Sequence, residues 1–171
     1  MSDVNAINFA LLMVRVCIGL SFAMHGYNHL FRGGKAAGTG RWFDSLGMKP
    51  GVFHAYLASV TEFAAGFGMA AGLFTTLDAA GIVGTLFVAF WLVHRHNGFF
   101  IIKEGWEYVT VLMVTGVGIA MIGPGEWSLD DKIGFADKLD GWWGLAIGAG
   151  GGLAVSIGTL LIFYRPPAKS S

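Results

Sequence analysis

Long apolar segments separated by short polar stretches make up most of the chain. The expected helices cover residues 6–31, 53–74, 79–94, 106–122 and 141–164. Gly, Pro and charged residues fill the connections, and these residue types end helices. The pattern predicts an all-α membrane protein, a four-helix transmembrane bundle followed by a fifth, C-terminal transmembrane helix.

Two connections are long enough to need their own interpretation. Residues 32–51 are Gly-rich, but no strand precedes them and the GxxxxGK[ST] spacing is absent, so a nucleotide site is not expected. We expect an interfacial loop there, with a short amphipathic turn starting at Arg41. Residues 126–140 carry five carboxylates against Lys132 and Lys138, a net charge of −3. This link is expected to be a solvated loop with a surface turn.

The composition supports lipid as the solvent. Of the 171 residues 54% are hydrophobic and 13% charged, against about a quarter charged in soluble domains. Eleven Lys and Arg balance eleven Asp and Glu, so no basic field exists to attract nucleic acid. The single cysteine, Cys17, cannot form an internal disulfide, and it is expected to be a buried packing residue.

The distribution of Lys and Arg predicts the orientation. The N-terminus has no basic region before its apolar run, so we expect a retained membrane helix and not a cleaved signal. With five spans, only Lys132 and Lys138 fall on the N-terminal side of the membrane. The positive-inside rule then places the N-terminus and the link 131–140 outside and the tail 165–171 in the cytoplasm.

Two opposite charges lie near the middle of apolar segments. Arg15 is in the first segment and Glu62 in the second. An arginine at membrane depth costs roughly 2.5–3.5 kcal/mol, so such residues usually face a partner inside the bundle. The structural interpretation is an Arg15–Glu62 salt bridge between the two helices. The functional alternative is a site at which the pair holds a quinone headgroup or relays a proton.

Histidines collect near the cytoplasmic ends of the helices. His25 and His29 are four residues apart, a spacing that can place both rings on one metal, and His94 and Glu107 are expected at the same end. Interfacial histidines also serve as polar anchors or handle protons. Both interpretations stay open, and no metal is assigned.

A ridge of small residues marks the last apolar segment. Gly144, Gly148, Gly152 and Ser156 are four residues apart. Such a ridge predicts close docking on a neighbouring helix, in this chain or in a partner.

The chain resembles the DoxX family over about residues 9–130. The matching motifs occur in order and are Arg15, His25-Gly26 with Leu30-Phe31, Phe43 with Leu46-Gly47, Glu62 with Gly66 and Gly72-Leu73, His94 with Gly98-Phe99, Glu107, and Gly123-Pro124-Gly125 with Ser128-Leu129-Asp130. The resemblance implies a four-helix membrane domain over 6–130. The fifth helix, 141–164, lies outside it.

The resemblance also implies a function. Some relatives are subunits of thiosulfate:quinone oxidoreductase, and mycobacterial members are associated with a sulfurtransferase and superoxide dismutase in oxidative-stress defence. By this likeness the chain is expected to be a subunit of a quinone-linked redox system in a bacterial inner (plasma) membrane, working with other membrane or redox proteins. The implied catalytic residues are Arg15, His25, Glu62 and Glu107, the implied cofactor-binding residues are His29 and His94, and quinone is the candidate cofactor.

The alternative is a non-catalytic anchor or assembly subunit of a larger membrane complex. Two departures from the family pattern also bear on function. His29 stands where relatives often have Lys, and Thr76 where they often have Arg. Both positions lack a cation, which argues against an anionic substrate there.

Overall fold

A computed structural model describes residues 3–167, and this part of the chain is almost entirely helical. Residues 168–171 of the expected tail lie outside the described residues. The elements, in chain order, are α1 (Val4–Phe31), α2 (Lys35–Ser45), α3 (Gly51–Ala71), α4 (Thr75–Ala89), η1 (Phe90–His94), η2 (Ile101–Lys103), α5 (Glu107–Ile122), α6 (Leu129–Lys132), α7 (Gly141–Gly144), η3 (Leu145–Gly151) and α8 (Gly152–Phe163). η1 continues α4 without a break, and α7, η3 and α8 form one continuous rod.

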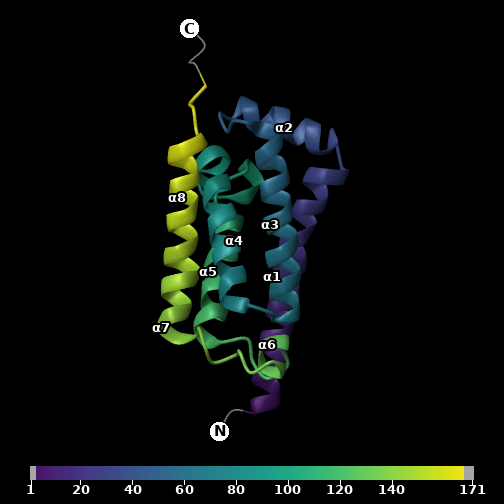
Figure 1. The fold of residues 1–171 in the computed structure, drawn as a ribbon, viewed down its shortest axis with the longest axis vertical. Helices are drawn as coiled ribbons and strands as arrows, with labels where there is room; N and C mark the ends of the chain where they lie inside the picture. The colour runs from purple at the N-terminus through teal and green to yellow at the C-terminus, as the bar shows by residue number, and fades with distance from the viewer. Residues whose placement is uncertain (1–2, 168–171) are drawn as a thin grey trace.

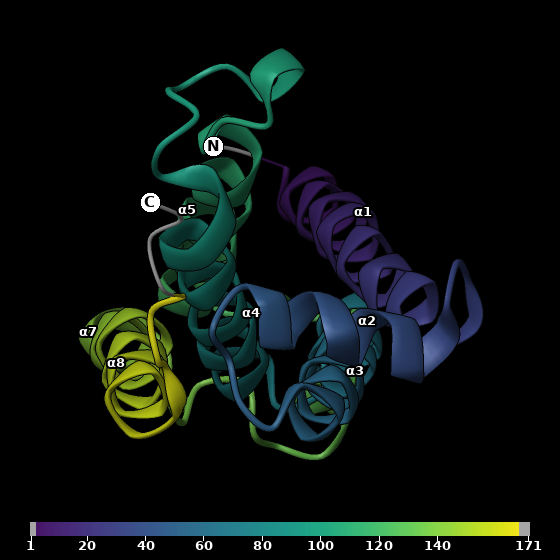
Figure 2. The same ribbon diagram turned by 90° about the horizontal axis from the view of Figure 1, so that it is seen from above.

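The long helices stand side by side as a bundle, with α4 in its centre (Figures 1 and 2). α4 packs against α3, α5 and α8, while α1 packs mainly against α3. α2 lies across the end of α3, and the link that contains α6 covers the opposite end of the bundle (Figure 1). The core between α1, α3, α4 and α5 contains Ile18, Phe22, Ala65, Met69, Ala79, Ile82, Leu86, Val109, Leu112, Ile119 and Ala120.

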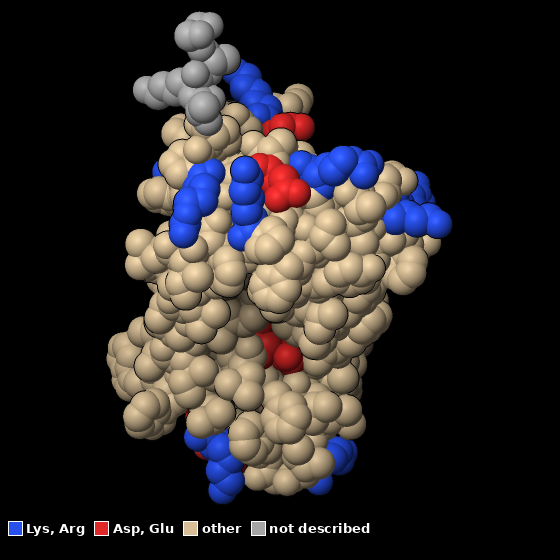
Figure 3. Space-filling model, turned by 45° about the horizontal axis from the view of Figure 1, so that its top comes forward, with Lys and Arg blue, Asp and Glu red and all other residues tan. Residues whose placement is uncertain are grey.

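The exterior matches a bilayer environment. Within residues 3–167, three rods are long and apolar enough to cross a membrane: Val4–Phe31, Thr75–His94 and Gly141–Phe163. α5 is apolar but has only 16 residues. Lys and Arg gather toward the two ends of the molecule, and uncharged residues form most of the band between them (Figure 3). The expectation of a helical membrane protein is confirmed, whereas the count of four plus one crossings stays a prediction.

The small-residue ridge is used inside this chain. A Cβ at Gly144 would collide with the backbone of Ala120, and one at Gly152 would lie 2.7 Å from the carbonyl oxygen of Ala80. Ser156, the last member of the ridge, is buried. The ridge therefore lets the C-terminal rod pack closely on α4 and α5, which answers the question of which helix it docks on.

Two local expectations were wrong. Residues 35–45 form an 11-residue helix, α2, where only a short turn was expected. Its glycines permit close packing, because a Cβ at Gly40 would come within 2.6 Å of Val52 Cγ2 at the start of α3. Close packing against α3 thus offsets the low helix propensity of glycine. Cys17 was expected to be buried, but it is exposed.

Candidate functional site

Glycine contacts fix the register between the antiparallel helices α1 and α3. A Cβ at Gly19 would lie 2.7 Å from the amide nitrogen of Ala70, and one at Gly26 would lie 3.1 Å from Glu62 Cβ. Gly72, which ends α3, directly contacts the guanidinium of Arg15. Ten residues separate positions 62 and 72, so Glu62 and Arg15 lie about 15 Å apart along the bundle.

Arg15 is therefore not bound to Glu62, and the predicted salt bridge is wrong. Its side chain is 0% exposed, and Nη2 donates a 2.6 Å hydrogen bond to the carbonyl oxygen of Trp127 in the link. Asp130, also in the link, attracts it electrostatically. Arg15 thus joins the first helix to the segment that covers the N-terminal end of the bundle.

Asp130 is the residue at this end that the sequence interpretation missed. It was counted among the solvated carboxylates of the link, but it is only 2% exposed. Its carboxylate accepts hydrogen bonds from the backbone nitrogens of Phe74 and Thr75 at 2.7 and 3.0 Å and from Thr75 Oγ1 at 2.8 Å. It therefore caps the start of α4 from a distant part of the chain. The signal was its place in the Ser128-Leu129-Asp130 motif.

Glu62 lies at the other polar layer of the bundle. It is 4% exposed, and its Oε1 lies 3.6 Å from His29 Nε2. That distance suits an ion pair but is too long for a good hydrogen bond. Glu62 Oε2 is buried without a hydrogen-bond partner among the described residues. The aromatic rings of Trp42 and Phe43 on α2 pack near His29, which places this pair under α2.

One turn before His29, His25 faces α5. Its Nε2 lies 3.4 Å from the hydroxyl oxygen of Tyr108, and the two ring centroids are 5.8 Å apart. Tyr108 was missed, because sequence reasoning chose the neighbouring charge at Glu107. A usable signal was the spacing: Tyr108, Thr115 and Ile122 are seven residues apart and share one stripe of α5.

Two other expected site residues bind the loop before α5, although His94 is close enough to His25 to act on it electrostatically. His94 Nδ1 lies 2.6 Å from the carbonyl oxygen of Glu104, and Glu107 Oε2 accepts a 3.0 Å hydrogen bond from the backbone nitrogen of Ile101. Both side chains therefore bind the backbone of the loop between η1 and α5. In the part of the chain that the structure describes, no three His, Cys, Asp or Glu side chains are placed to hold a metal.

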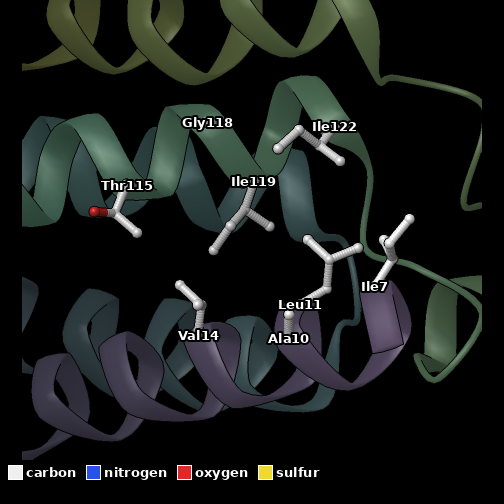
Figure 4. Close-up of a pocket in the computed structure, with 8 residues that line it drawn as sticks. All are labelled: Ile7, Ala10, Leu11, Val14, Thr115, Gly118, Ile119 and Ile122. Atoms are coloured by element: carbon white, nitrogen blue, oxygen red, sulfur yellow. The ribbon is translucent and has the colours of Figure 1, made fainter. Parts of the chain in front are cut away.

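An apolar groove runs between α1 and α5 (Figure 4). Its volume is about 390 Å³, and it is lined by Ile7, Ala10, Leu11 and Val14 from α1 and by Thr115, Gly118, Ile119 and Ile122 from α5. The same two helices bring His25 and Tyr108 together nearer the α2 end. Groove and polar pair therefore belong to one seam of the bundle.

The fold and its apolar exterior define a helical membrane protein whose polar groups form two layers, one at each end. The family model named DoxX matches residues 10–95, and the chain belongs to the DoxX family. The match contains Arg15, His25, His29, Glu62 and His94. Neither the comparison with curated proteins nor the comparison with solved structures gave a match.

Proposed function

We propose that this DoxX-family protein is a quinone-binding subunit of a redox system in a bacterial inner membrane. The observation that supports this function most is the seam between α1 and α5. Its groove takes apolar chains from the lipid side, and the His25–Tyr108 pair lies farther along the same seam. Seven residues of α5 separate Thr115 from Tyr108, or about 10 Å along the helix.

The residues present fit a quinone. A quinone has a polar ring with two carbonyl oxygens and an apolar tail, and it accepts electrons and protons. The groove lining is hydrocarbon except for the Thr115 hydroxyl, which suits the tail. The Tyr108 hydroxyl and His25 Nε2 are donors of the kind that bind carbonyl oxygens. A mostly apolar cleft with a few convergent polar groups is the usual form of such a site.

The His29–Glu62 pair would serve proton transfer beside this site. His29 is one helical turn from His25, and it lies between that ring and the α2 end of the bundle. Glu62 has one buried oxygen without a partner in the described part of the chain, so its carboxyl group can hold a proton that it passes to His29. In this proposal a partner redox protein supplies the electrons, and Arg15 contributes to folding instead of catalysis.

A binding experiment in lipid nanodiscs tests the proposal. Full-length protein is titrated with a long-tailed and a tailless quinone, and quenching of tryptophan fluorescence reports binding. Gly118→Leu fills the groove, since a Cβ at Gly118 meets nothing within 4 Å, and it should weaken binding of the long-tailed quinone. Tyr108→Phe should weaken binding of both quinones, because it removes the hydroxyl donor.

Gly150→Leu is the matched control, since Gly150 also has open space around it but lies on η3, away from the groove. It should bind both quinones like the unmodified protein. If no saturable binding occurs, or if Gly118→Leu and Gly150→Leu behave alike, the quinone proposal is wrong.

The second candidate is a non-catalytic assembly subunit. The small-residue ridge of the last apolar segment was expected to dock on a helix of this chain or of a partner; Gly144 and Gly152 pack on α5 and α4 of this chain, so the ridge does not by itself support a partner. A stable complex that co-purifies with the protein but shows no quinone binding would favour this candidate over the first.

A further inference from the structure

The loop between η1 and α5 presents the most exposed large apolar side chain described in the chain. Ile102 is 89% exposed, Phe100 64% and Ile101 51%. These residues stand together around η2, and the segment projects outward from the bundle just before α5 (Figure 2). An ordered apolar tip of this kind calls for an apolar partner, because scattered single exposures are normal but a contiguous group is not.

Six of the seven backbone nitrogens from Ile101 to Glu107 donate to acceptors in the same segment. The backbone nitrogens of Gly105, Trp106 and Glu107 donate to the carbonyl oxygens of Phe100, Gly98 and Phe99 at 3.1, 3.1 and 2.8 Å. Those of Lys103 and Glu104 donate to Phe100 and Ile101 at 3.0 and 2.8 Å.

Side chains bind two of the backbone groups. The Glu107 carboxylate binds the backbone nitrogen of Ile101, and the carbonyl oxygen of Glu104 lies within hydrogen-bond distance of His94 Nδ1 and Asn97 Nδ2. Irregular backbone is tolerated at membrane depth only when its polar groups are bound internally. A loop tip in water would not need this, because water would supply partners.

The length of α5 places the loop at membrane depth. Trp142 and Trp143 are 79% and 66% exposed, and they precede Gly144, which packs on Ala120 near the end of α5. Exposed tryptophans at the end of a rod mark a membrane interface. From there the 16 residues of α5 rise only about 24 Å, whereas the hydrocarbon core is about 30 Å thick. The residues before α5 therefore begin within the hydrocarbon region.

Two basic side chains next to the loop suit a position close to the headgroups, where the exposed Glu104 carboxylate would also lie. Lys103 follows the apolar tip directly, and the Arg95 guanidinium lies 3.8 Å from the centroid of the Trp91 ring. Long basic side chains near the end of a span reach toward lipid headgroups while their stems stay in apolar surroundings.

We propose that residues 98–106 form a loop immersed in the lipid leaflet at the α2 end of the bundle, with Phe100 and Ile102 among the acyl chains and Lys103 at the headgroups. Glu107 is the positioning residue of this loop, since its carboxylate binds the Ile101 amide that lipid could not bind. This inference concerns a surface apart from the α1–α5 seam and does not depend on quinone binding.

Depth-dependent fluorescence quenching tests the proposal on the full chain. Cys17→Ser removes the only cysteine, and Ile102→Cys then carries an environment-sensitive dye in vesicles of phosphatidylethanolamine and phosphatidylglycerol. The dye at position 102 should be quenched by lipids that carry a doxyl group on the acyl chain and protected from aqueous iodide. Lys138→Cys in the link is the aqueous control, and Val114→Cys, 65% exposed on α5, is the control within the membrane.

Quenching at position 102 like that at position 138 would overturn the proposal. Protection from both iodide and doxyl lipids would also overturn it, because a protein partner would then cover the loop. Glu107→Ala should shift the dye at position 102 toward iodide, and Glu107→Gln, which retains an acceptor oxygen, should restore the protection. An unchanged dye in Glu107→Ala would refute the positioning role of that carboxylate.

Discussion

Replacement of Asp130 by alanine tests how the link holds the bundle together. The substitution removes the carboxylate that accepts hydrogen bonds from the Phe74 and Thr75 backbone nitrogens and from Thr75 Oγ1. It also removes the anion that attracts Arg15, whose side chain is fully buried. The start of α4 would lose its cap, and the buried guanidinium would lose a nearby attracting charge.

The expected loss in the free energy of unfolding is about 3–5 kcal/mol. Loss of a helix N-cap alone costs about 1 kcal/mol. The substitution also leaves the Phe74 and Thr75 backbone nitrogens without their acceptor, and a buried unsatisfied donor costs about 1–3 kcal/mol. Arg15 keeps its hydrogen bond to the Trp127 carbonyl oxygen, so the loss of the Asp130 charge should add little more. Asp130→Asn, which retains one acceptor oxygen, should fall between alanine and the unmodified protein.

Unfolding by sodium dodecyl sulfate in mixed micelles measures this loss, with tryptophan fluorescence and circular dichroism as the signals. Asp131→Ala is the matched control. Among the described residues, the Asp131 side chain forms its one ion pair with the exposed Lys132, at 3.6 Å. Exposed pairs contribute little, so Asp131→Ala should change stability by less than about 0.5 kcal/mol. If Asp130→Ala and Asp131→Ala unfold at the same detergent fraction, the assigned role of Asp130 is refuted.

Two further substitutions separate the two polar layers. Glu62→Gln should change the free energy of unfolding by less than about 1 kcal/mol, because no buried arginine loses its partner. Quinone reduction, measured with the native partner system, should fall. Marked unfolding with normal turnover would contradict this expectation. Asn8→Ala should lower the free energy of unfolding by about 1–2 kcal/mol, because Asn8 exchanges hydrogen bonds of 2.9 and 3.0 Å with Glu126. Asn5→Ala, at an exposed position of the same helix, is the control. Equal detergent sensitivity of the two variants would count against a stabilising role of the Asn8–Glu126 contact.

The helices were predictable, but the register between them was not. The length of the apolar segments and the Gly and Pro residues between them predicted the start of α5 to within one residue. The Arg15–Glu62 salt bridge was predicted because the midpoints of both helices were assumed to lie at the same depth in the membrane. In the structure α3 ends at the level of Arg15, while residues 4–14 of α1 continue past it alongside the link. That offset depends on the contacts of Gly19 and Gly26, which charge positions do not reveal.

Residue type alone also pointed to the wrong one of two adjacent residues at the start of α5. Glu107 was predicted as a site residue, but its carboxylate binds a loop amide, and it is Tyr108 that faces His25. One residue of a helix turns the side chain by about 100°, so a charge and its neighbour serve different surfaces. Asp130 was hidden for a different reason. Its burial results from the folding of the link onto the α4 terminus, a contact between residues 55 apart in the chain.

The two polar layers differ in what they can do chemically. Arg15 stays protonated, is fully buried and donates to a fixed backbone oxygen, so it has no means to exchange a proton. Asp130, which attracts it electrostatically, is likewise bound by three donors. At the other layer Glu62 keeps an oxygen without a partner, and His29 lies at 3.6 Å without a direct hydrogen bond. A loosely paired carboxyl and imidazole can change partners or protonation state without unfolding the bundle. The proton transfer proposed above is therefore assigned to the α2 end, where His29 and Glu62 lie beside the α1–α5 seam.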